Sequence, residues 1–342
     1  MLAPSRYSPA IVPRTITGDA LVELLAAPAA LPAAGEVLLV DGVPDASAGS
    51  RWRAALDRLA TAPFVVVGRG GWTQGGTPAA LELVDVVAED DDTVAAVVDT
   101  ASRAPLASSA LAVHLRASAT RTAAAGLVAE SALYSTLQAG PEFAAWRAGT
   151  PARHRPPSTG PAVVVGRTGD ELGIELDRPE VRNALGVQMR DELLEALAIA
   201  EADPDLHVTI SGRGPSFCAG GDLDEFGTAP DPATAHLIRL ERSVGAVLVR
   251  LAPRVTVRLH GACYGSGVEL AAFAGRVIAH PDTTMALPEL GFGLVPGAGG
   301  TVSIPARIGR HAAARLAFTR QPIDAATALA WGLVDELAGP VV

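Results

Sequence analysis

Strand-like runs alternate with helix-like runs through the second half of this chain, and this alternation limits its fold more than any other feature. The strand-like runs are rich in β-branched and apolar residues and occur at 163–166, 171–179, 207–213, 255–261 and 276–281. Amphipathic stretches lie between them at 184–203 and 233–250, and a short helical stretch begins at about 267. Strands that alternate with helices predict a parallel sheet covered by helices, which is an α/β fold.

The first half shows the same alternation in a less complete form. The runs VLLVDG at 37–42, RWRAALDRLAT at 51–61 and FVVVGRG at 64–70 predict one βαβ unit. Residues 93–148 are nearly all helical in pattern, and the acidic run at 89–92 suits a helix start because negative charge is favoured there. Residues 148–161 combine Pro, Gly, Ser and Thr without periodicity, as exposed connections do. We therefore predict two parts, residues 1–150 and 161–342.

Charge and cysteine content narrow the classes of function. The net charge of −10 argues against a nucleic-acid partner, since phosphate binding needs clustered cations. The chain has no lysine, so an anionic ligand is expected to be held by Arg, by backbone N–H groups or by helix N-termini. Cys218 and Cys263 have the spacing of neither a disulfide framework nor a metal site. With no signal-peptide pattern and no apolar run of ~18 residues, we expect a soluble cytoplasmic protein with no membrane partner.

Three glycine-containing segments of the second half carry the candidate chemistry. They are SFCAGGDLDEF at 216–226, HGACYGSGVEL at 260–270 and ALPELGFGLVPGAGGT at 286–301. Glycines in such turns expose backbone N–H groups to a ligand, and a helix beginning near Ser266 adds its positive end, so the pattern indicates an oxyanion hole. Glu269 and Glu289 follow neighbouring strand ends, where α/β folds collect catalytic residues. Paired carboxylates suit general acid/base work on a water or on an α-proton.

The order of these segments resembles the crotonase superfamily, also called the enoyl-CoA hydratase/isomerase family. AGGD at 219–222, GSGVE at 265–269, and PE at 288–289 followed by PGAGGT at 296–301 match the motifs of that family in order. The resemblance covers roughly 160–338, including RPEVRNAL at 178–185 and the stretch 319–337. It implies a crotonase-like ββα superhelix in the second half, an acyl-CoA thioester as substrate, and no cofactor or metal.

The resemblance also implies roles for individual residues. The backbone N–H groups of Ala219 and Ser266 become the oxyanion hole, while Glu269 and Glu289 activate water and protonate Cα. The implied reaction is that of a lyase, hydration of a trans-2-enoyl-CoA to a 3-hydroxyacyl-CoA, as in fatty acid metabolism. The implied substrate-binding positions are Arg182, Ala184, Gly220, Asp222, Gly265 and Gly297.

Several of these segments also suit plainer roles. Asp222 is expected to cap a short helix at 223–226, and His260 to be a hydrogen-bonded turn histidine. Cys218 and Cys263 look like small packing residues with no cation nearby in sequence to favour a thiolate. Arg182 suits either a CoA phosphate or an ordinary surface position.

Other activities remain open on the same residues. Within the family these are enoyl-CoA isomerisation and the hydrolysis or cofactor-free dioxygenation of an aryl-acyl-CoA. A non-catalytic acyl-CoA-binding partner is the alternative from another class, and the presence of both glutamates counts against it. A serine hydrolase is discounted because CYGSG at 263–267 has Cys in place of the first Gly of its motif.

Members of the family continue with further helices after the segment that ends here near Leu337, and those helices cover the active site and build a trimer or hexamer. Residues 93–148 resemble that tail, so the first half resembles a decayed crotonase-like unit without catalytic residues. We expect a homo-oligomer in which the 93–148 helices pack over the catalytic half. The apolar stripe expected to make this contact comprises Leu111, Leu115, Leu127, Leu133, Tyr134, Leu137, Phe143 and Trp146.

Overall fold

A four-stranded parallel sheet begins the chain in the computed structural model, which describes residues 13–27, 30–45, 49–153 and 160–339. Its strands, in spatial order, are β1 (Arg14–Thr17), β2 (Val37–Asp41), β3 (Val65–Arg69) and β4 (Val86–Val87). Four helices accompany them: α1 (Gly18–Ala26), α2 (Ser50–Leu59), α3 (Trp72–Gly75) and α4 (Pro78–Leu81). The predicted βαβ unit is confirmed as β2, α2 and β3, with β2 and β3 parallel. β1 was not predicted.

Both faces of this first sheet are buried, which explains its unbroken apolar runs. Leu38 and Val40 of β2 pack into a cluster with α1 and α2. Val37 and Leu39 point to the opposite face and join the larger core that extends into the second half of the chain. Alternate residues of a strand face opposite sides of the sheet, so a sheet covered on both sides needs an apolar residue at every position.

Four successive helices follow, as the pattern of 93–148 predicted. They are α5 (Asp91–Arg103), α6 (Pro105–Arg116), α7 (Ala123–Gln138) and α8 (Pro141–Gly149), with a 3-10 turn η1 (Ser118–Thr120) before α7. The acidic run begins α5 as expected, because the Asp90 carboxylate accepts the Thr93 N–H at 2.7 Å. The predicted connection at 148–161 lies in part outside the described residues.

The second half is built on a six-stranded sheet in the order β13-β10-β8-β7-β6-β5. β5 pairs antiparallel with β6 and the other neighbours are parallel. A smaller sheet has the order β12-β11-β9, with β9 and β11 parallel. The strands of the two sheets are β5 (Val163–Thr168), β6 (Glu171–Leu176), β7 (His207–Gly212), β8 (Val255–Leu259), β9 (Ala262–Tyr264), β10 (Arg276–Ala279), β11 (Thr284–Ala286), β12 (Ile323–Asp324) and β13 (Glu336–Leu337). The predicted α/β fold is confirmed.

The helices of the second half depart from the sequence pattern in two places. The run 233–250 is two helices, because the chain leaves helical geometry at Arg242 and a second helix begins after the Ser243 cap. The helix expected at 223–226 is a turn. The helical elements are η2 (Pro179–Val181), α9 (Val187–Ala202), α10 (Pro232–Glu241), α11 (Val244–Leu251), η3 (Ala252–Arg254), α12 (Ser266–Ala271), η4 (Glu289–Phe292), α13 (Gly300–Thr319) and α14 (Ala325–Trp331).

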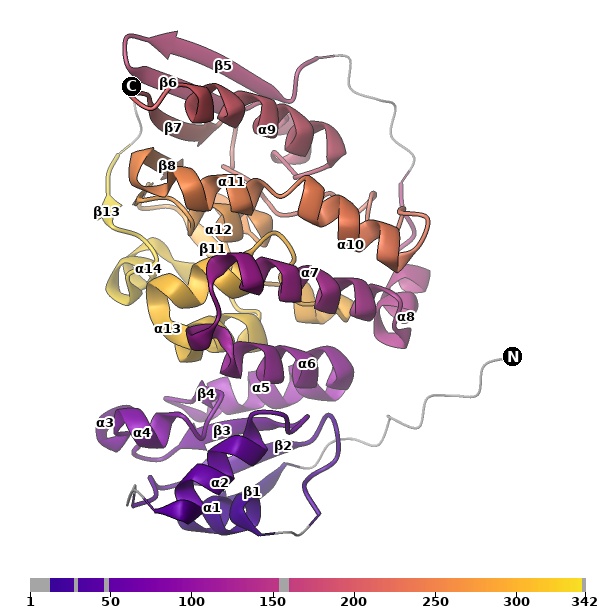
Figure 1. The fold of residues 1–342 in the computed structure, drawn as a ribbon, viewed down its shortest axis with the longest axis vertical. Coiled ribbons are helices and arrows are strands. Elements are labelled where there is room, and N and C mark those ends of the chain that lie inside the picture. The colour runs from indigo at the N-terminus through magenta and orange to yellow at the C-terminus, as the bar shows by residue number, and fades with distance from the viewer. Residues whose placement is uncertain (1–12, 28–29, 46–48, 154–159, 340–342) are drawn as a thin grey trace.

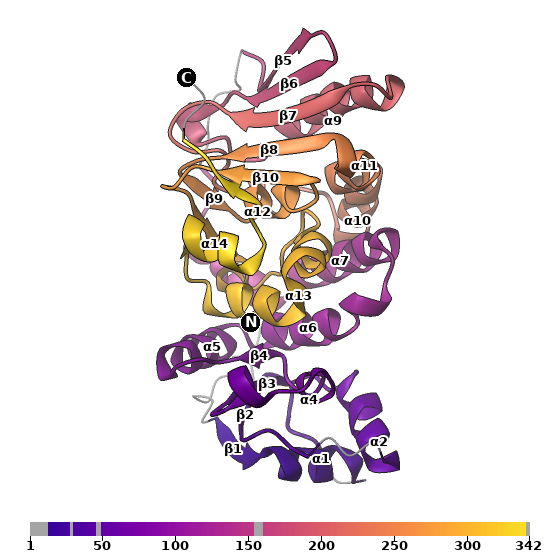
Figure 2. The ribbon, with the colours of Figure 1, turned by 90° about the vertical axis from the view of Figure 1, so that its left-hand side faces the viewer.

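Helices α5 to α8 lie between the first sheet and the second half of the chain. Both ribbon views show α5 and α6 beside α13, with the β1–β4 sheet beyond them, and α7 alongside α10 (Figures 1 and 2). The expected packing of the 93–148 helices over the second half is therefore confirmed. The members of the stripe that are buried in the shared core are Leu111, Leu115, Tyr134, Leu137 and Phe143.

Polar contacts also join the two halves. The Arg310 guanidinium of α13 donates to the carbonyl oxygens of Leu81, Glu82 and Val84 at 2.9 to 3.0 Å. Arg310 also lies 3.9 Å from Asp85, which forms a buried ion pair with Arg116 at 2.7 Å within the first half. Within the described residues, no helix combines the length and the apolar character needed to cross a membrane.

Candidate active site

A cavity of about 380 Å³ brings the three glycine-containing segments together. Ser266 and Glu269 reach it from α12, Glu289 from η4, and Gly297 and Ala298 from the loop that precedes α13. Gly221 and Asp222 line it from the turn after β7. One wall comes from the first half of the chain, where α7 contributes Tyr134 and Gln138.

The start of α12 depends on a glycine in a strained conformation. Gly265 has φ +48 and donates its N–H to the Ala286 carbonyl at 2.9 Å, which fixes α12 beside β11. A Cβ atom at this position would lie 2.5 Å from Glu289 Oε1. Gly265 is therefore required both by its backbone geometry and by the close approach of the Glu289 carboxyl.

Glu269 is buried on α12 and held by backbone donors. Its Oε2 atom accepts the N–H groups of Ala298 at 2.7 Å and Gly300 at 2.9 Å. Burial raises the pKa of Glu269 to about 7, and the backbone donors act in the opposite direction. A carboxyl that receives several donors and has no donor role in the site is suited to the ionised form.

Glu289 has the contrasting environment. It is only 7% exposed, and its Oε2 atom has no hydrogen-bond partner within the described part of the chain. Burial, and then the negative charges of Glu269 and Glu130, raise the pKa of Glu289 well above its ordinary value. Neighbouring buried carboxyls favour unequal protonation, so this arrangement favours a proton on Glu289 and a charge on Glu269.

The backbone N–H groups of Ser266 and Gly221, two residues that line the cavity, have no hydrogen-bond partner among the residues described. Gly221 lies between two residues paired with Leu185, because Gly220 accepts the Leu185 N–H at 2.8 Å and Asp222 donates to the Leu185 carbonyl at 3.1 Å. The N–H of Ala219 is donated to the Arg182 carbonyl at 3.0 Å. The Ala219 N–H expected in the oxyanion hole is thus already used within the protein.

The other sequence-predicted residues divide into two groups. Asp222 and Gly297 line the cavity together with the glutamates, and the Asp222 carboxylate accepts the Asp224 N–H at 3.0 Å within the turn. The described lining of the cavity does not include Arg182, Ala184, Gly220 or Gly265. Arg182 is exposed and has a positive φ of 53, and its part in the site is structural through its carbonyl.

The cysteines and His260 have the plain roles expected of them. Cys218 and Cys263 are buried, and burial raises the pKa of both thiols. His260 Nε2 contacts the Gly214 carbonyl at 2.9 Å. Among the residues described, no group of three or more His, Cys, Asp or Glu side chains is arranged to hold a metal ion.

Sequence reasoning missed four residues of the site: Gly221, Glu130, Tyr134 and Arg239. The sequence pattern places Tyr134 only in the packing stripe, whereas in the structure its ring covers Gly297. The signal that could identify Glu130 is that it is the only charged residue in the α7 sequence AAAGLVAESALYSTLQ. A single carboxylate on an otherwise apolar and small-residue helix is costly to bury without donors.

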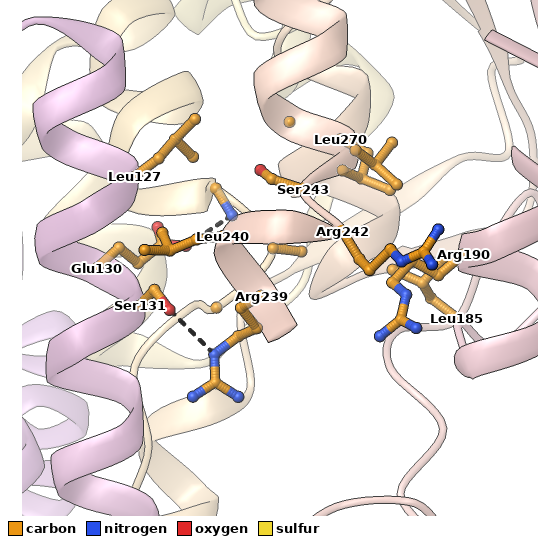
Figure 3. Close-up of a pocket in the computed structure, with 15 residues that line it drawn as sticks. Leu127, Glu130, Ser131, Leu185, Arg190, Arg239, Leu240, Arg242, Ser243 and Leu270 are labelled. Atoms are coloured by element: carbon orange, nitrogen blue, oxygen red, sulfur yellow. Dashed lines mark hydrogen bonds between the residues drawn. The ribbon is translucent and has the colours of Figure 1, made fainter. Parts of the chain in front are cut away.

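A smaller cavity of about 150 Å³ adjoins the first, and both are lined by Arg190, Arg239 and Leu185. In Figure 3, Glu130 and Ser131 extend from α7 toward this space, with Arg239 of α10 beside Ser131. Arg239 lies over the Tyr134 ring, 4.6 Å from its centroid, and donates to the hydroxyls of Ser131 and Ser135. Polar residues of the first half thus line the site along with those of the second half.

Comparisons with known proteins agree on one family. Residues 172–340 match the family described as Enoyl-CoA hydratase/isomerase. The chain is 36% identical over 165 residues to the Bacillus subtilis protein YhaR, named as an enoyl-CoA hydratase/isomerase. The aligned residues cover 47% of this chain and 64% of YhaR. It is 35% identical over 164 residues to the mitochondrial enoyl-CoA hydratase domain-containing protein 2 of Bos taurus, covering 47% of this chain and 55% of that protein.

The enoyl-CoA hydratase from Thermoplasma volcanium is 35% identical, with a TM-score of 0.49, over 53% of this chain and 73% of the hydratase. The chain spans less than two thirds of the length of the two curated relatives. In each case the match covers about half of this chain.

Proposed function

The chain belongs to the crotonase superfamily, the enoyl-CoA hydratase/isomerase family, and on that premise we propose that it hydrates a trans-2-enoyl-CoA to a 3-hydroxyacyl-CoA. The observation that carries the proposal is the pair of buried glutamates in contrasting environments, Glu269 and Glu289, beside two unpartnered backbone N–H groups in one cavity. Hydration needs a base, an acid and a site for developing negative charge. These four groups supply all three.

The oxyanion site in this proposal consists of the Ser266 and Gly221 N–H groups. Addition of water to an enoyl thioester moves negative charge onto the thioester oxygen. Two fixed donors at hydrogen-bonding distance from that oxygen lower the barrier, and removal of one such donor typically costs about 3 to 4 kcal/mol. Gly221 takes the place first expected for Ala219, since the Ala219 N–H is donated to Arg182.

The environments of the glutamates assign their roles. Glu269, with two backbone donors on Oε2, is the carboxylate that takes a proton from water as the water oxygen bonds to Cβ of the substrate. Glu289, which keeps a proton, delivers it to Cα as the enolate collapses to the thioester. After one turnover Glu269 carries the proton taken from water and Glu289 is ionised. Transfer of that proton from Glu269 to Glu289 restores the starting form of the pair. No cofactor enters this sequence.

A panel of trans-2-enoyl-CoA thioesters of different chain lengths tests the proposal. Hydration removes the enoyl-thioester absorbance, and the product can be identified as the 3-hydroxyacyl-CoA by mass spectrometry. Glu269→Gln and Glu289→Gln are each expected to lower kcat by ~10²-fold or more, because loss of a general acid or base typically costs 10² to 10⁴. If the panel binds but none is turned over, the protein is an acyl-CoA-binding partner and the hydratase proposal is wrong.

Double-bond isomerisation is the second candidate, and one observation favours it. Glu289 Oε2 is a buried carboxyl oxygen without a partner among the described residues, while Glu269 Oε2 is held by two N–H groups. Isomerisation needs one shuttle that removes a proton from one carbon and returns it to another. Loss of activity in Glu289→Gln but not in Glu269→Gln, with a 3-enoyl-CoA as substrate, would identify an isomerase.

The proposal extends to the architecture of the whole protein. The second half is a crotonase-like ββα superhelix, and residues 1–150 are a decayed unit of the same kind whose helices now cover the neighbouring site. The parallel first sheet followed by four helices supports this relation. Assembly as a trimer or hexamer in the cytoplasm is part of the same proposal, and light scattering of the purified protein measures the assembly.

A further inference from the structure

One short loop is held by two carboxylates from opposite sides. Along the segment 298–301, the N–H groups of Ala298 and Gly300 are donated to Glu269, at 2.7 and 2.9 Å. The alternate N–H groups, those of Gly299 and Thr301, are donated to Glu130 of α7, at 2.7 and 2.8 Å. The first half of the chain therefore fixes the loop that orients one of the catalytic glutamates.

A directed hydrogen-bond chain ends on Glu130. A guanidinium can only donate, so Arg121 donates to His114 Nδ1, at 3.1 Å. Burial, followed by the charge of Arg121, lowers the pKa of His114 to about 4, so the neutral ring carries its proton on Nε2 and donates to Thr301 Oγ1 at 2.9 Å. The Thr301 hydroxyl in turn donates to Glu130 Oε2 at 2.7 Å. With this hydroxyl and two N–H groups, Glu130 receives three donors.

Glu130 is also part of the charge balance of the cavity. It is 2% exposed, and burial followed by the charge of Glu269 raises its pKa. The N–H groups of Gly299 and Thr301 and the Thr301 hydroxyl all donate to the Glu130 carboxyl, which lowers the pKa and favours the ionised form. The charge of Glu130 in turn raises the pKa of Glu289. The titratable and charged groups that face Glu130 or line the same two cavities are Glu269, Glu289, Asp222, Glu225, His114, Tyr134, His236, Arg239, Arg190 and Arg242.

We propose that Glu130, contributed by the first half of the chain, is a positioning residue of the active site. Glu130 fixes the loop that holds Glu269, and its negative charge keeps a proton on the catalytic pair. The inference rests on the proposed acid/base roles of Glu269 and Glu289. It goes beyond them by assigning a function in the reaction to a region whose residues were expected to have none. Glu130 touches the backbone of the loop and acts through it, so it is not itself a catalytic residue.

Glu130→Gln and Glu130→Asp separate the two parts of this role. Glutamine is nearly isosteric and removes the charge. Its NH₂ group can only donate, so it cannot accept a hydrogen bond from the N–H or O–H group that it faces. Aspartate keeps the charge but withdraws it from the loop by one methylene. We expect both variants to lower kcat by about tenfold to a hundredfold with a small change in KM, since misplacement of a catalytic group by ~1 Å has an effect of this size.

The pH profile distinguishes positioning from a merely structural role. Loss of the Glu130 charge lowers the pKa of Glu289 and of its coupled partner Glu269, so both limbs of the kcat/KM profile of Glu130→Gln shift to lower pH, by roughly one unit. Glu130→Asp keeps both limbs near their original pH. A profile of Glu130→Gln that coincides with that of the unmodified protein, at unchanged kcat, would overturn the proposal.

Glu142→Gln is the matched control. Glu142 is another carboxylate of the first half that accepts two backbone N–H groups, those of Leu106 at 2.7 Å and Ala107 at 3.0 Å, but it does not line either cavity. Its substitution is expected to lower the melting temperature without moving the pH profile. If Glu130→Gln does not fold, Thr301→Val replaces it. Loss of the hydroxyl donor raises the pKa of Glu130 and so reduces its negative charge. Both limbs of the kcat/KM profile should then shift to lower pH, by less than in Glu130→Gln. Unmoved limbs in Thr301→Val would then reject the proposal.

A second measurement keeps this proposal separate from the hydratase proposal. The side-chain carboxyl signals of ¹³C-labelled glutamate can be titrated by NMR in the free protein, with Glu269 and Glu289 assigned from their Gln variants. Glu130→Gln is expected to lower both pKa values whether or not any thioester is turned over. Absence of turnover together with shifted titrations rejects hydration and retains the role of Glu130, whereas unshifted titrations reject the role of Glu130 alone.

Discussion

A chain that begins at Pro161 keeps both catalytic glutamates and both proposed oxyanion donors, yet we expect it to aggregate or to be inactive. The truncation uncovers the surface against which α5 to α8 pack. Five large apolar side chains of those helices, each at most 8% exposed, are lost from the shared core: Leu111, Leu115, Tyr134, Leu137 and Phe143. The cavity loses its Tyr134 wall, and the N–H groups of Gly299 and Thr301 lose Glu130.

The magnitude follows from the burial of these side chains. Full burial of a large apolar side chain stabilises a fold by about 1.5 to 3 kcal/mol, so the set contributes about 7 to 15 kcal/mol. If half of that burial is against other residues of the first half, the second half still loses about 4 to 7 kcal/mol. The net stability of a domain is only about 5 to 15 kcal/mol, so the loss is large enough to unfold the remaining chain or to leave it aggregation-prone.

Size-exclusion chromatography, circular dichroism and the enoyl-thioester assay measure the result. Co-expression of residues 91–153 as a separate polypeptide is the control, and it should restore soluble protein if the missing contact is the cause. A truncated chain that is soluble, melts at the temperature of the full chain and has the same kcat/KM would refute the reasoning, since the first half would then be an independent appendage.

Further predictions concern pH, packing and thiol reactivity. Glu269 must be ionised to accept a proton, and burial raises its pKa to about 7, so kcat/KM should fall about tenfold for each pH unit below that value, as a pH–rate profile will record. Gly297→Ala places a Cβ against the Tyr134 ring and should destabilise the protein by about 1 to 3 kcal/mol in urea unfolding; Gly297→Ala combined with Tyr134→Leu should recover part of the loss. Cys218 and Cys263 should react with a thiol reagent only after unfolding, and fast labelling of the native protein would contradict their burial.

The sequence was informative wherever local chemistry decides the structure. Glu269 and Glu289 follow strand ends, and a strand end followed by a glycine turn has few geometries, so the convergence of the two glutamates on one cavity could be predicted. The sequence could not predict whether Ala219 or Gly221 offers its N–H group to the oxyanion site. That depends on which N–H group of a single turn is taken by the Arg182 carbonyl, and this is settled only when η2 packs against that turn.

Contacts between distant segments were predictable in outline and not in detail. The apolar period of 93–148 predicted that these helices cover the second half, because a stripe of that size needs a partner. It gave no register along the covered surface. Glu130 therefore remained an isolated acidic residue in the sequence, although in the structure it accepts two N–H groups and a hydroxyl from a loop about 170 residues away.

The placement of α5 to α8 before the segment that they cover also has a consequence for synthesis. These helices leave the ribosome while the surface they need is still untranslated, and at ~5 to 20 residues per second the strand β13 follows roughly ten to forty seconds later. During that interval Leu111, Leu115 and Phe143 have only part of their final surroundings. Contacts as distant as Arg310 with Leu81, 229 residues apart, also give the fold a high contact order. The nascent chain should therefore fold late and depend on chaperones more than a chain of the same length with local contacts.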